Sequence, residues 1–366
     1  MAFESGSLES VVGMNPSGDL QFYRDKKVLV TGHTGFKGTW LCFILNALGA
    51  KVVGYALPPE DDSLFIISGI EEKIDSYYGD VRDYDALNKV FTEQEPEVVF
   101  HLAAQPLVLD GYRDPKYTYE TNVMGTVNLL ECIRNSSSVK TGLNVTTDKV
   151  YENREIPGYR YVETDQLDGY DPYSNSKSCS ELVTHSYISS FFQDKGIVFS
   201  TARAGNVIGG GDYSANRIIP DAVKAACAHE SLIVRNKDSV RPYQHVLEPL
   251  FAYLMIVAGQ SADPELAGYY NVGPDEDDCA STGELITLFA KYWGDDFKWE
   301  AKSNPNAPHE AGYLGLDSTK VKETIGWQPR WNVDETVAKT VEWYKGYNEH
   351  EDIVRIIEKQ IAEYMA

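Results

Sequence analysis

A tyrosine and a lysine four residues apart could form a proton-transfer pair in this chain. Tyr173 and Lys177 lie in the segment DPYSNSK, residues 171–177, and its proline predicts the first turn of a helix. Side chains four residues apart share one face of a helix. A phenol has an ordinary pKa of about 10, and a neighbouring ammonium group lowers that pKa toward the range of a general base. An isolated pair of this kind is more often two surface residues, so the rest of the chain must decide.

A glycine-rich turn near the start of the chain is a second motif that could bind a ligand. The apolar run 26–31 predicts a buried strand, a helix is predicted over 40–48, and a second strand is predicted over 51–56. Strand, glycine turn, helix and strand in this order are the context of a dinucleotide-binding fingerprint. A plain tight turn is the alternative. The predicted cofactor contacts in the turn are Gly32, His33, Thr34, Gly35, Phe36, Lys37 and Gly38.

Further cofactor contacts are predicted where later strands end, because open α/β sheets bind ligands at the carboxyl ends of their strands. The strand over 74–78 leads to Asp80 and Val81, which would lie beside an adenine ring. The strand over 98–102 is followed by small residues that would let a cofactor lie close, and the helix predicted over 118–134 carries an asparagine. These additional predicted contacts are Leu102, Ala103, Ala104 and Asn122. His101 lies inside the apolar strand and is interpreted as a core residue.

The residues alone leave the choice between NAD and NADP open. An NAD site usually carries an acid at the end of the second strand, where this chain has Gly54-Tyr55-Ala56-Leu57. His33 and Lys37 could tolerate a 2′-phosphate.

A third group of polar residues follows the strand predicted over 143–146. Thr147, Asp148 and Lys149 stand at its carboxyl end, on the edge where the glycine turn and the Tyr173 helix are also expected. Thr147 offers a hydroxyl beside the Tyr/Lys pair. Asp148 and Lys149 could act as an acid and a base, and an exposed ion pair on a loop is the alternative.

The alternation of strands and helices predicts an α/β fold, namely a Rossmann-type doubly wound parallel sheet. After residue 205 the segments become shorter and richer in glycine and proline, which predicts a smaller C-terminal substrate-binding α/β domain. The predicted dinucleotide-binding domain covers 25–205, with 242–269 returning to it. Residues 206–241 and 270–366 form the predicted substrate domain, and 1–24 are expected to be a loose extension.

Composition excludes several classes of protein. Lys and Arg number 33 and Asp and Glu number 55, a net charge of −22, which argues against a nucleic-acid partner. No apolar run is long enough for a membrane span, and residues 1–19 lack the pattern of a secretory signal. The five cysteines never form a Cys-x-x-Cys pair. Neither a disulfide framework nor a metal site is therefore expected, and a cytoplasmic location fits.

With Thr147, the Tyr/Lys pair resembles the Ser/Thr-Tyr-Lys set of the extended short-chain dehydrogenase/reductase superfamily, whose members act largely on nucleotide sugars. Finer motifs between residue 26 and beyond residue 344 are similar to those of the CDP-glucose 4,6-dehydratase family. These motifs are 31–38, 101–108, 121–126, 147–149, 169–177, 203–212, 241–249 and 326–331.

The resemblance implies NAD as cofactor, a CDP-hexose as small-molecule substrate and a CDP-4-keto-6-deoxyhexose as product. Tyr173 would take the proton of the sugar 4-hydroxyl as hydride leaves C4, and Lys177 would hold the cofactor ribose. Asp148 would be the acid at C6 and Lys149 the base at C5, where the related dTDP-glucose enzymes carry an Asp-Glu pair. The superfamily also implies a homodimer or a dimer of dimers, formed by the helices predicted over 118–134 and 172–193.

Cationic side chains in the second half of the chain are predicted to hold the substrate. A guanidinium group binds phosphate bidentately, so Arg217 and Arg241 are expected to clamp the diphosphate, although either could be a surface residue. Asn206 could donate to the same diphosphate or to a sugar hydroxyl. The full set of predicted substrate contacts is Gln105, Asn206, Arg217, Arg235, Arg241 and Tyr313.

One segment departs from the family pattern. Where the CDP enzymes usually read Arg-x-Ser-Tyr, this chain has Leu109-Asp110-Gly111-Tyr112, and this difference bears most on substrate identity. The alternatives are a nucleotide-sugar 4-epimerase or 4-ketoreductase, which would need no Asp/Lys pair, and a non-catalytic dinucleotide-binding scaffold.

Overall fold

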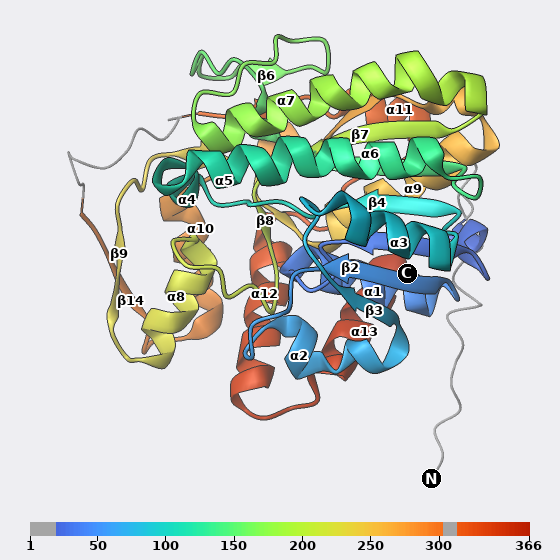
Figure 1. Cartoon of the computed structure of the whole chain (residues 1–366). Coiled ribbons are helices and arrows are strands. Elements are labelled where there is room, and N and C mark those ends of the chain that lie inside the picture. Colours follow the sequence, from blue (N-terminus) through green and yellow to red (C-terminus); the bar gives the residue numbers. More distant parts are fainter. Residues whose placement is uncertain (1–19, 303–312) are drawn as a thin grey trace.

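Seven parallel strands form the main sheet, in the order β12-β7-β5-β4-β1-β2-β3 (Figure 1). The computed structural model describes residues 20–302 and 313–366. The order reverses between β1 and β4, as in a doubly wound sheet, so the predicted Rossmann-type fold is confirmed. The strands are β1 (Lys27–Thr31), β2 (Lys51–Ala56), β3 (Asp75–Tyr78), β4 (Val98–His101), β5 (Thr141–Thr147), β7 (Val198–Ala204) and β12 (Tyr269–Val272).

Helices cover both faces of this sheet and form two apolar cores with it. On one face α1 (Phe36–Ala47) and α9 (Leu247–Ala262) contribute to the larger core. On the other face α3 (Tyr84–Gln94) and α6 (Gly125–Asn135) contribute to the second core. Helix α7 (Pro172–Tyr187) runs beside α6 (Figure 1). Because strands buried on both faces favour apolar side chains, β1 and β4 read as short apolar runs, whereas β5 and β7 also carry buried polar side chains.

Residues after β7 build a second, smaller set of elements, of which α8, β9, α10 and β14 lie beyond the carboxyl ends of the sheet strands (Figure 1). In this set β9 pairs with β14 in parallel and β10 pairs with β13 in antiparallel orientation. Its elements are β8 (Val207–Ile208), α8 (Ile218–Cys227), β9 (Ser231–Val234), β10 (Val240–Arg241), β11 (Gln244–His245), β13 (Ala280–Ser281), α10 (Thr282–Trp293), β14 (Lys298–Ala301), β15 (Gly315–Leu316), α11 (Thr319–Ile325), α12 (Val333–Asn348) and α13 (Ile353–Met365).

Three details differ from the sequence predictions. The helix predicted over 118–134 is α5 (Pro115–Tyr119), a π-helical turn (Glu120–Met124) and α6 in succession. Strand β12 continues the main sheet to Val272, beyond the boundary predicted at 269. Tyr23, which fell in the predicted extension, is fully buried and donates a hydrogen bond to the carbonyl of Leu254 at 2.7 Å. Residues 1–19 of that extension lie outside the described residues.

Within the described residues, none of the helices is both long enough and apolar enough to cross a membrane.

Candidate active site

A cavity of about 1030 Å³ opens at the carboxyl edge of the sheet. Its wall comes from the glycine turn, from the ends of β3, β4 and β5, from the first turns of α7, and from 204–243 of the second set of elements. The three motifs that the sequence places at one edge therefore do meet, and they meet in one cavity.

The glycine turn fits the approach of a phosphate group. Gly32 has a φ of +76°, and a Cβ added to Gly38 would lie 2.1 Å from the Gly32 carbonyl oxygen, so only glycine lets α1 pack this closely on β1. A Cβ on Gly35 would meet nothing closer than 3.4 Å, which leaves that side of the turn open to the cavity. No side chain caps the N-terminus of α1, so its first N–H groups remain available to an anion.

Most predicted cofactor residues lie in the cavity wall. Those in the wall are Gly32, Thr34, Gly35, Phe36, Lys37, Gly38, Asp80, Val81, Leu102, Ala103, Ala104, Tyr173 and Lys177.

His33 and Asn122 lie outside this wall. The His33 ring packs over Gly54 and its Nε2 lies 2.7 Å from Ser76 Oγ. Burial lowers the pKa of His33 to about 4, so the ring is neutral at pH 7 and adds no charge for a 2′-phosphate. Asn122 is buried and ties the loop after β4 to α7, since its Nδ2 donates to the Gln105 carbonyl at 3.0 Å and to Ser176 Oγ at 2.9 Å.

The wall beyond the end of β2 is formed by Ala56, Leu57, Gly79, Asp80 and Val81. The Asp80 carboxylate is paired with Arg82, with Oδ2 and Nη2 2.6 Å apart. The charge of this wall is therefore balanced locally and does not decide between a free ribose and a 2′-phosphate.

Tyr173 and Lys177 begin a helix as predicted. Asp171 caps α7 by accepting from the Ser174 N–H at 3.0 Å, and Pro172 occupies the first helical position. Both reactive side chains are almost fully buried. Lys177 Nζ donates to the Val145 carbonyl at 3.1 Å, which holds the ammonium group between α7 and β5.

The expected lowering of the Tyr173 pKa is not found. Burial raises the pKa of Tyr173 to about 12, against a lowering by its hydrogen bond with Thr147 and by the charge of Arg217. Burial also lowers the pKa of Lys177 to about 8, opposed by Glu181. The sequence shows the spacing of the two groups but not how deeply they are buried, and burial decides the direction of both pKa shifts.

The segment at the end of β5 forms a tight hydrogen-bonded group. Asp148 Oδ1 accepts from Thr147 Oγ1 at 2.9 Å and from Lys149 Nζ at 3.1 Å, and Lys149 Nζ also donates to Asn206 Oδ1 at 3.2 Å. Asp148 is fully buried, which disfavours an exposed ion pair. Its Oδ2 has no hydrogen-bond partner among the described residues. Thr147 and Lys149 line the cavity, whereas Asp148 is not part of its wall.

Four of the six predicted substrate residues line the cavity, namely Asn206, Arg217, Arg235 and Arg241. Arg217 is held by Asp212, with Nη1 and Oδ2 3.0 Å apart.

Gln105 and Tyr313 lie outside the wall. The Gln105 side chain stays within its own loop and α5, donating to Thr118 Oγ1 at 2.8 Å and accepting from the Leu107 N–H at 2.5 Å. The Tyr313 carbonyl accepts from Asn153 Nδ2 at 3.1 Å.

The segment that departs from the family pattern touches the site. Leu109 and Asp110 line the cavity, and Asp110 pairs with Arg113 at 3.0 Å. A Cβ on Gly111 would lie 3.2 Å from the Tyr173 backbone nitrogen, so this glycine lets α4 (Val108–Arg113) pack closely against the start of α7.

Sequence reasoning missed Tyr253 and correctly assigned His101. Tyr253 on α9 accepts from Lys37 Nζ at 3.4 Å, and burial with the charges of Arg217 and Lys177 lowers the pKa of Lys37 to about 7. His101 is a core residue whose Nδ1 lies 2.7 Å from Thr31 Oγ1. Among the described residues, no cluster of three or more potential metal ligands exists.

Comparison with known proteins identifies the family. The family model described as GDP-mannose 4,6 dehydratase matches residues 29–340. A CDP-glucose 4,6-dehydratase of Salmonella typhimurium (strain LT2) is 44% identical over 358 residues, which cover 95% of this chain and 98% of that protein.

Solved structures share the fold. A UDP-glucose 4-epimerase of Thermus thermophilus in complex with NAD has a TM-score of 0.74 at 25% identity, covering 87% of this chain and 99% of that one. A Bacillus anthracis dTDP-glucose 4,6-dehydratase in complex with NAD has a TM-score of 0.73 at 21% identity, covering 90% and 99%. With a family model matched across most of its length, this chain belongs to the GDP-mannose 4,6-dehydratase family.

Proposed function

We propose that this chain is an NAD-dependent CDP-glucose 4,6-dehydratase, which converts CDP-glucose to CDP-4-dehydro-6-deoxyglucose and water. The observation that carries the proposal is that Tyr173, Lys177 and Lys149 line one cavity, and that the buried Asp148 carboxylate lies 3.1 Å from Lys149 Nζ. An epimerase or ketoreductase would use only the Tyr173/Lys177 pair. The 44% identical relative is named for this reaction.

NAD fits the cavity, because the open side of Gly35 and the uncapped N-terminus of α1 suit its pyrophosphate. Bound NAD supplies the oxidised nicotinamide that accepts hydride from C4 and returns it to C6. Lys177, whose Nζ donates to the Val145 carbonyl, would also donate to the ribose hydroxyls.

Tyr173 takes the proton of the sugar 4-hydroxyl during C4 oxidation. Its phenol has a pKa raised to about 12 by burial, so it needs nearby positive charge before it can act as a base near neutral pH. The charge of Arg217 supplies part of it, and a bound oxidised nicotinamide would add to it.

Asp148 and Lys149 then remove water. A proton that moves from Lys149 Nζ to Asp148 across their 3.1 Å contact leaves an amine and a carboxylic acid side by side. The amine takes the C5 proton, which the 4-ketone has acidified, and the carboxylic acid protonates the departing C6 hydroxyl. Lys149 later returns a proton to C5. The proton that Tyr173 took from the 4-hydroxyl then passes to Asp148, which restores the starting protonation states. The buried Asp148 Oδ2 without a partner suits a group that meets its partner only in the substrate complex.

The substrate diphosphate would lie against Arg217, Arg235 and Arg241, a local concentration of cations in a protein with a net charge of −22. Which nucleotide and hexose bind depends on this wall and on Leu109 and Asp110.

We also propose a homodimer, or a dimer of dimers, in the cytoplasm. Met124, Leu182 and Phe191 are 50%, 54% and 40% exposed, and they lie on or beside the adjacent helices α6 and α7 (Figure 1). A Leu182→Glu variant should then run at half the wild-type molecular mass in light scattering, and an unchanged mass would contradict this interface. The five free cysteines suit a reducing compartment.

Incubation with CDP-glucose, with and without added NAD, tests the reaction. The expected product is lighter than the substrate by one water and carries a 4-ketone. Interconversion with the C4 epimer at unchanged mass would replace the dehydratase by an epimerase.

A further inference from the structure

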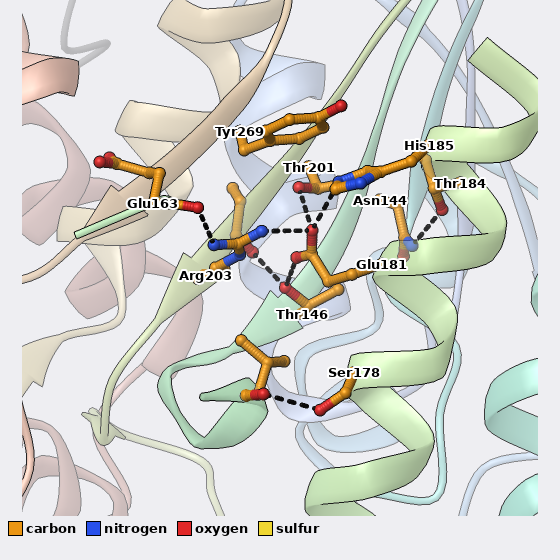
Figure 2. A network of polar contacts seen from close by, with 12 residues as sticks. Asn144, Thr146, Glu163, Ser178, Glu181, Thr184, His185, Thr201, Arg203 and Tyr269 are labelled. Atoms are coloured by element: carbon orange, nitrogen blue, oxygen red, sulfur yellow. Dashed lines mark hydrogen bonds and ion pairs between the residues drawn. The ribbon is translucent and has the colours of Figure 1, made fainter. Parts of the chain in front are cut away.

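A fully buried ion pair lies next to the active site without lining the cavity. Arg203 Nη2 on β7 and Glu181 Oε2 on α7 are 2.9 Å apart, and both side chains are at most 1% exposed. Figure 2 shows them at the centre of a polar network between the helix and the sheet.

Glu181 joins three elements. Its carboxylate accepts from the Thr146 hydroxyl on β5 and from Thr201 Oγ1 on β7 at 2.7 Å, and His185 Nε2 lies 3.5 Å away on the next turn of α7 (Figure 2). Although burial alone would raise the pKa of Glu181, Arg203 and these partners lower it to about 2. The carboxylate is therefore charged at neutral pH.

Arg203 extends the network to the cavity wall. Its Nη1 donates to Tyr151 Oη at 2.8 Å and to the Glu163 carbonyl at 3.0 Å. Tyr151 lines the cavity and donates in turn to Asn271 Oδ1 on β12 at 2.6 Å. One guanidinium group thus connects β7, the loop after the Asp/Lys segment, and the edge strand of the sheet.

Helix α7, strand β5 and the loop at Tyr151, which this network joins, each carry a reacting side chain or stand next to one. Glu181 is one helical turn beyond Lys177 on α7, and Thr146 directly precedes Thr147 on β5. Tyr151 follows Lys149 by two residues. Because Glu181 and Arg203 are outside the cavity wall, they can act on the reaction only through these neighbours.

The inner face of α7 is held mainly by hydrogen bonds. Ser180 and Thr184 accept from Asn144 Nδ2 at 2.9 Å each, and Ser176 accepts from Asn122 at 2.9 Å. Directional bonds allow one register of helix on sheet, whereas a smooth apolar face tolerates small shifts. A buried ion pair adds little net stability compared with apolar groups of similar size, so stability alone does not account for Glu181 and Arg203.

We propose that the buried Glu181–Arg203 pair is a positioning device that fixes α7 on β5, so that Tyr173 and Lys177 meet Thr147 and Lys149 in reacting geometry. This proposal rests on the proposed function in one respect, the oxidation of a sugar 4-hydroxyl at Tyr173. It adds two positioning residues that touch neither substrate nor cofactor.

The Glu181 carboxylate of this pair also acts electrostatically on the Lys177 ammonium group, one helical turn away on α7. The other titratable groups facing that ammonium are Tyr173 on its own helix, Lys37 from α1, and His101 from β4, which burial keeps neutral by lowering its pKa to about 3. Removing the Glu181 charge should therefore lower the pKa of Lys177 further below about 8. The ammonium form would then be lost at a lower pH.

The test compares Glu181→Gln with Glu248→Gln. Glu248 on α9 is also a buried carboxylate, bonded to the N–H groups of Arg330 and Trp331 and to Tyr364 Oη at 2.6 Å, and it is not part of the cavity wall. Three quantities are measured for each protein: the melting temperature, the dissociation constant for NAD, and the pH profile of kcat with CDP-glucose.

Glu181→Gln should lower kcat roughly tenfold or more with a smaller change in the KM for the sugar. It should also weaken NAD binding and move the alkaline limb of the profile to lower pH. Glu248→Gln should change only the melting temperature. A kcat and a pH profile equal to wild type in Glu181→Gln would overturn the proposal, as would equal effects of the two variants on all three quantities.

If Glu181→Gln does not fold, the double variant Glu181→Gln/Arg203→Met decides, because it removes both buried charges together. A folded double variant with low kcat and a shifted alkaline limb supports positioning, and one with wild-type kcat and profile refutes it. If the wild-type protein leaves CDP-glucose unchanged, the proposed function fails, while NAD affinity and its alkaline pH dependence still test the pair.

Discussion

Asp148→Asn separates dehydration from oxidation. The side chain is fully buried and its Oδ1 accepts from Thr147 and Lys149. Asparagine has nearly the same shape, and its carbonyl oxygen can accept the same two hydrogen bonds. The variant therefore removes a proton donor while leaving the geometry of Thr147, beside Tyr173, in place.

The expected magnitude follows from the role of a general acid. Positioned proton transfer contributes about 10²–10⁴-fold to a rate, or about 3–5 kcal/mol of barrier. Loss of a charge-assisted hydrogen bond should lower the free energy of unfolding by about 1.5–3 kcal/mol, which a domain of ordinary stability tolerates. The rate of formation of the 4-keto-6-deoxy product should therefore fall by about 10²–10⁴-fold, while C4 oxidation continues.

The assay follows the absorbance of reduced nicotinamide after rapid mixing with CDP-glucose, together with product release. In Asp148→Asn we expect the reduced cofactor to accumulate, because the hydride has no dehydrated sugar to return to. Asp221→Asn, which changes a carboxylate of the cavity wall, is the control and should behave as wild type. Equal loss of oxidation and dehydration in Asp148→Asn, or undiminished product formation, would refute the assignment.

Four further predictions follow from the site and its surroundings. Lys149→Ala should still oxidise C4 slowly but form roughly 10²-fold less product, and full dehydratase activity would exclude Lys149 as the C5 base. Tyr173→Phe should lower the rate of reduced-nicotinamide formation by at least about 10²-fold, with Tyr170→Phe as a control on an exposed tyrosine; comparable rates in the two variants would contradict a proton-accepting role. Gly38→Ala should lower the free energy of unfolding by about 1–3 kcal/mol in denaturant, since its Cβ would lie 2.1 Å from the Gly32 carbonyl oxygen. Gly35→Ala should keep the wild-type free energy of unfolding and weaken NAD binding. A stable Gly38→Ala protein together with a destabilised Gly35→Ala protein would contradict the roles given to these two glycines. Finally, burial lowers the pKa of His101 from 6.5 to about 3, so between these pH values the unfolded state binds one more proton than the folded state, and the folded state loses stability as the pH falls. The free energy of unfolding, measured at several pH values in this range, should depend on pH more steeply in wild type than in His101→Asn, by about 1.4 kcal/mol per pH unit. Equal pH dependence in the two proteins would rule this out.

The arrangement of the sheet and the meeting of three motifs could be predicted because the signals are local. Alternating apolar runs, glycine turns and a proline at the start of α7 fix the elements, and parallel strands bring their carboxyl ends to one edge. That is sufficient to bring Tyr173, Thr147 and Gly35 to one cavity.

Features that depend on depth or on distant partners could not be predicted. The direction of the Tyr173 pKa shift follows from burial, and the inward positions of Asn122 and Gln105 follow from hydrogen bonds to α7 and α5. Glu181 and Arg203 are 22 residues apart in the chain, and only packing of α7 on β7 joins them. A charged residue inside an apolar strand, as at Arg203, was the one available sign of a buried partner.

The central claim is that one cavity oxidises C4, expels the C6 hydroxyl and returns the hydride. Reaction of CDP-glucose in deuterated water, followed by mass spectrometry and NMR of the product, tests it most directly. The predicted product has lost one water, carries one deuterium at C5 and forms without net consumption of NAD. A sugar of unchanged mass with no deuterium at C5 would contradict the claim.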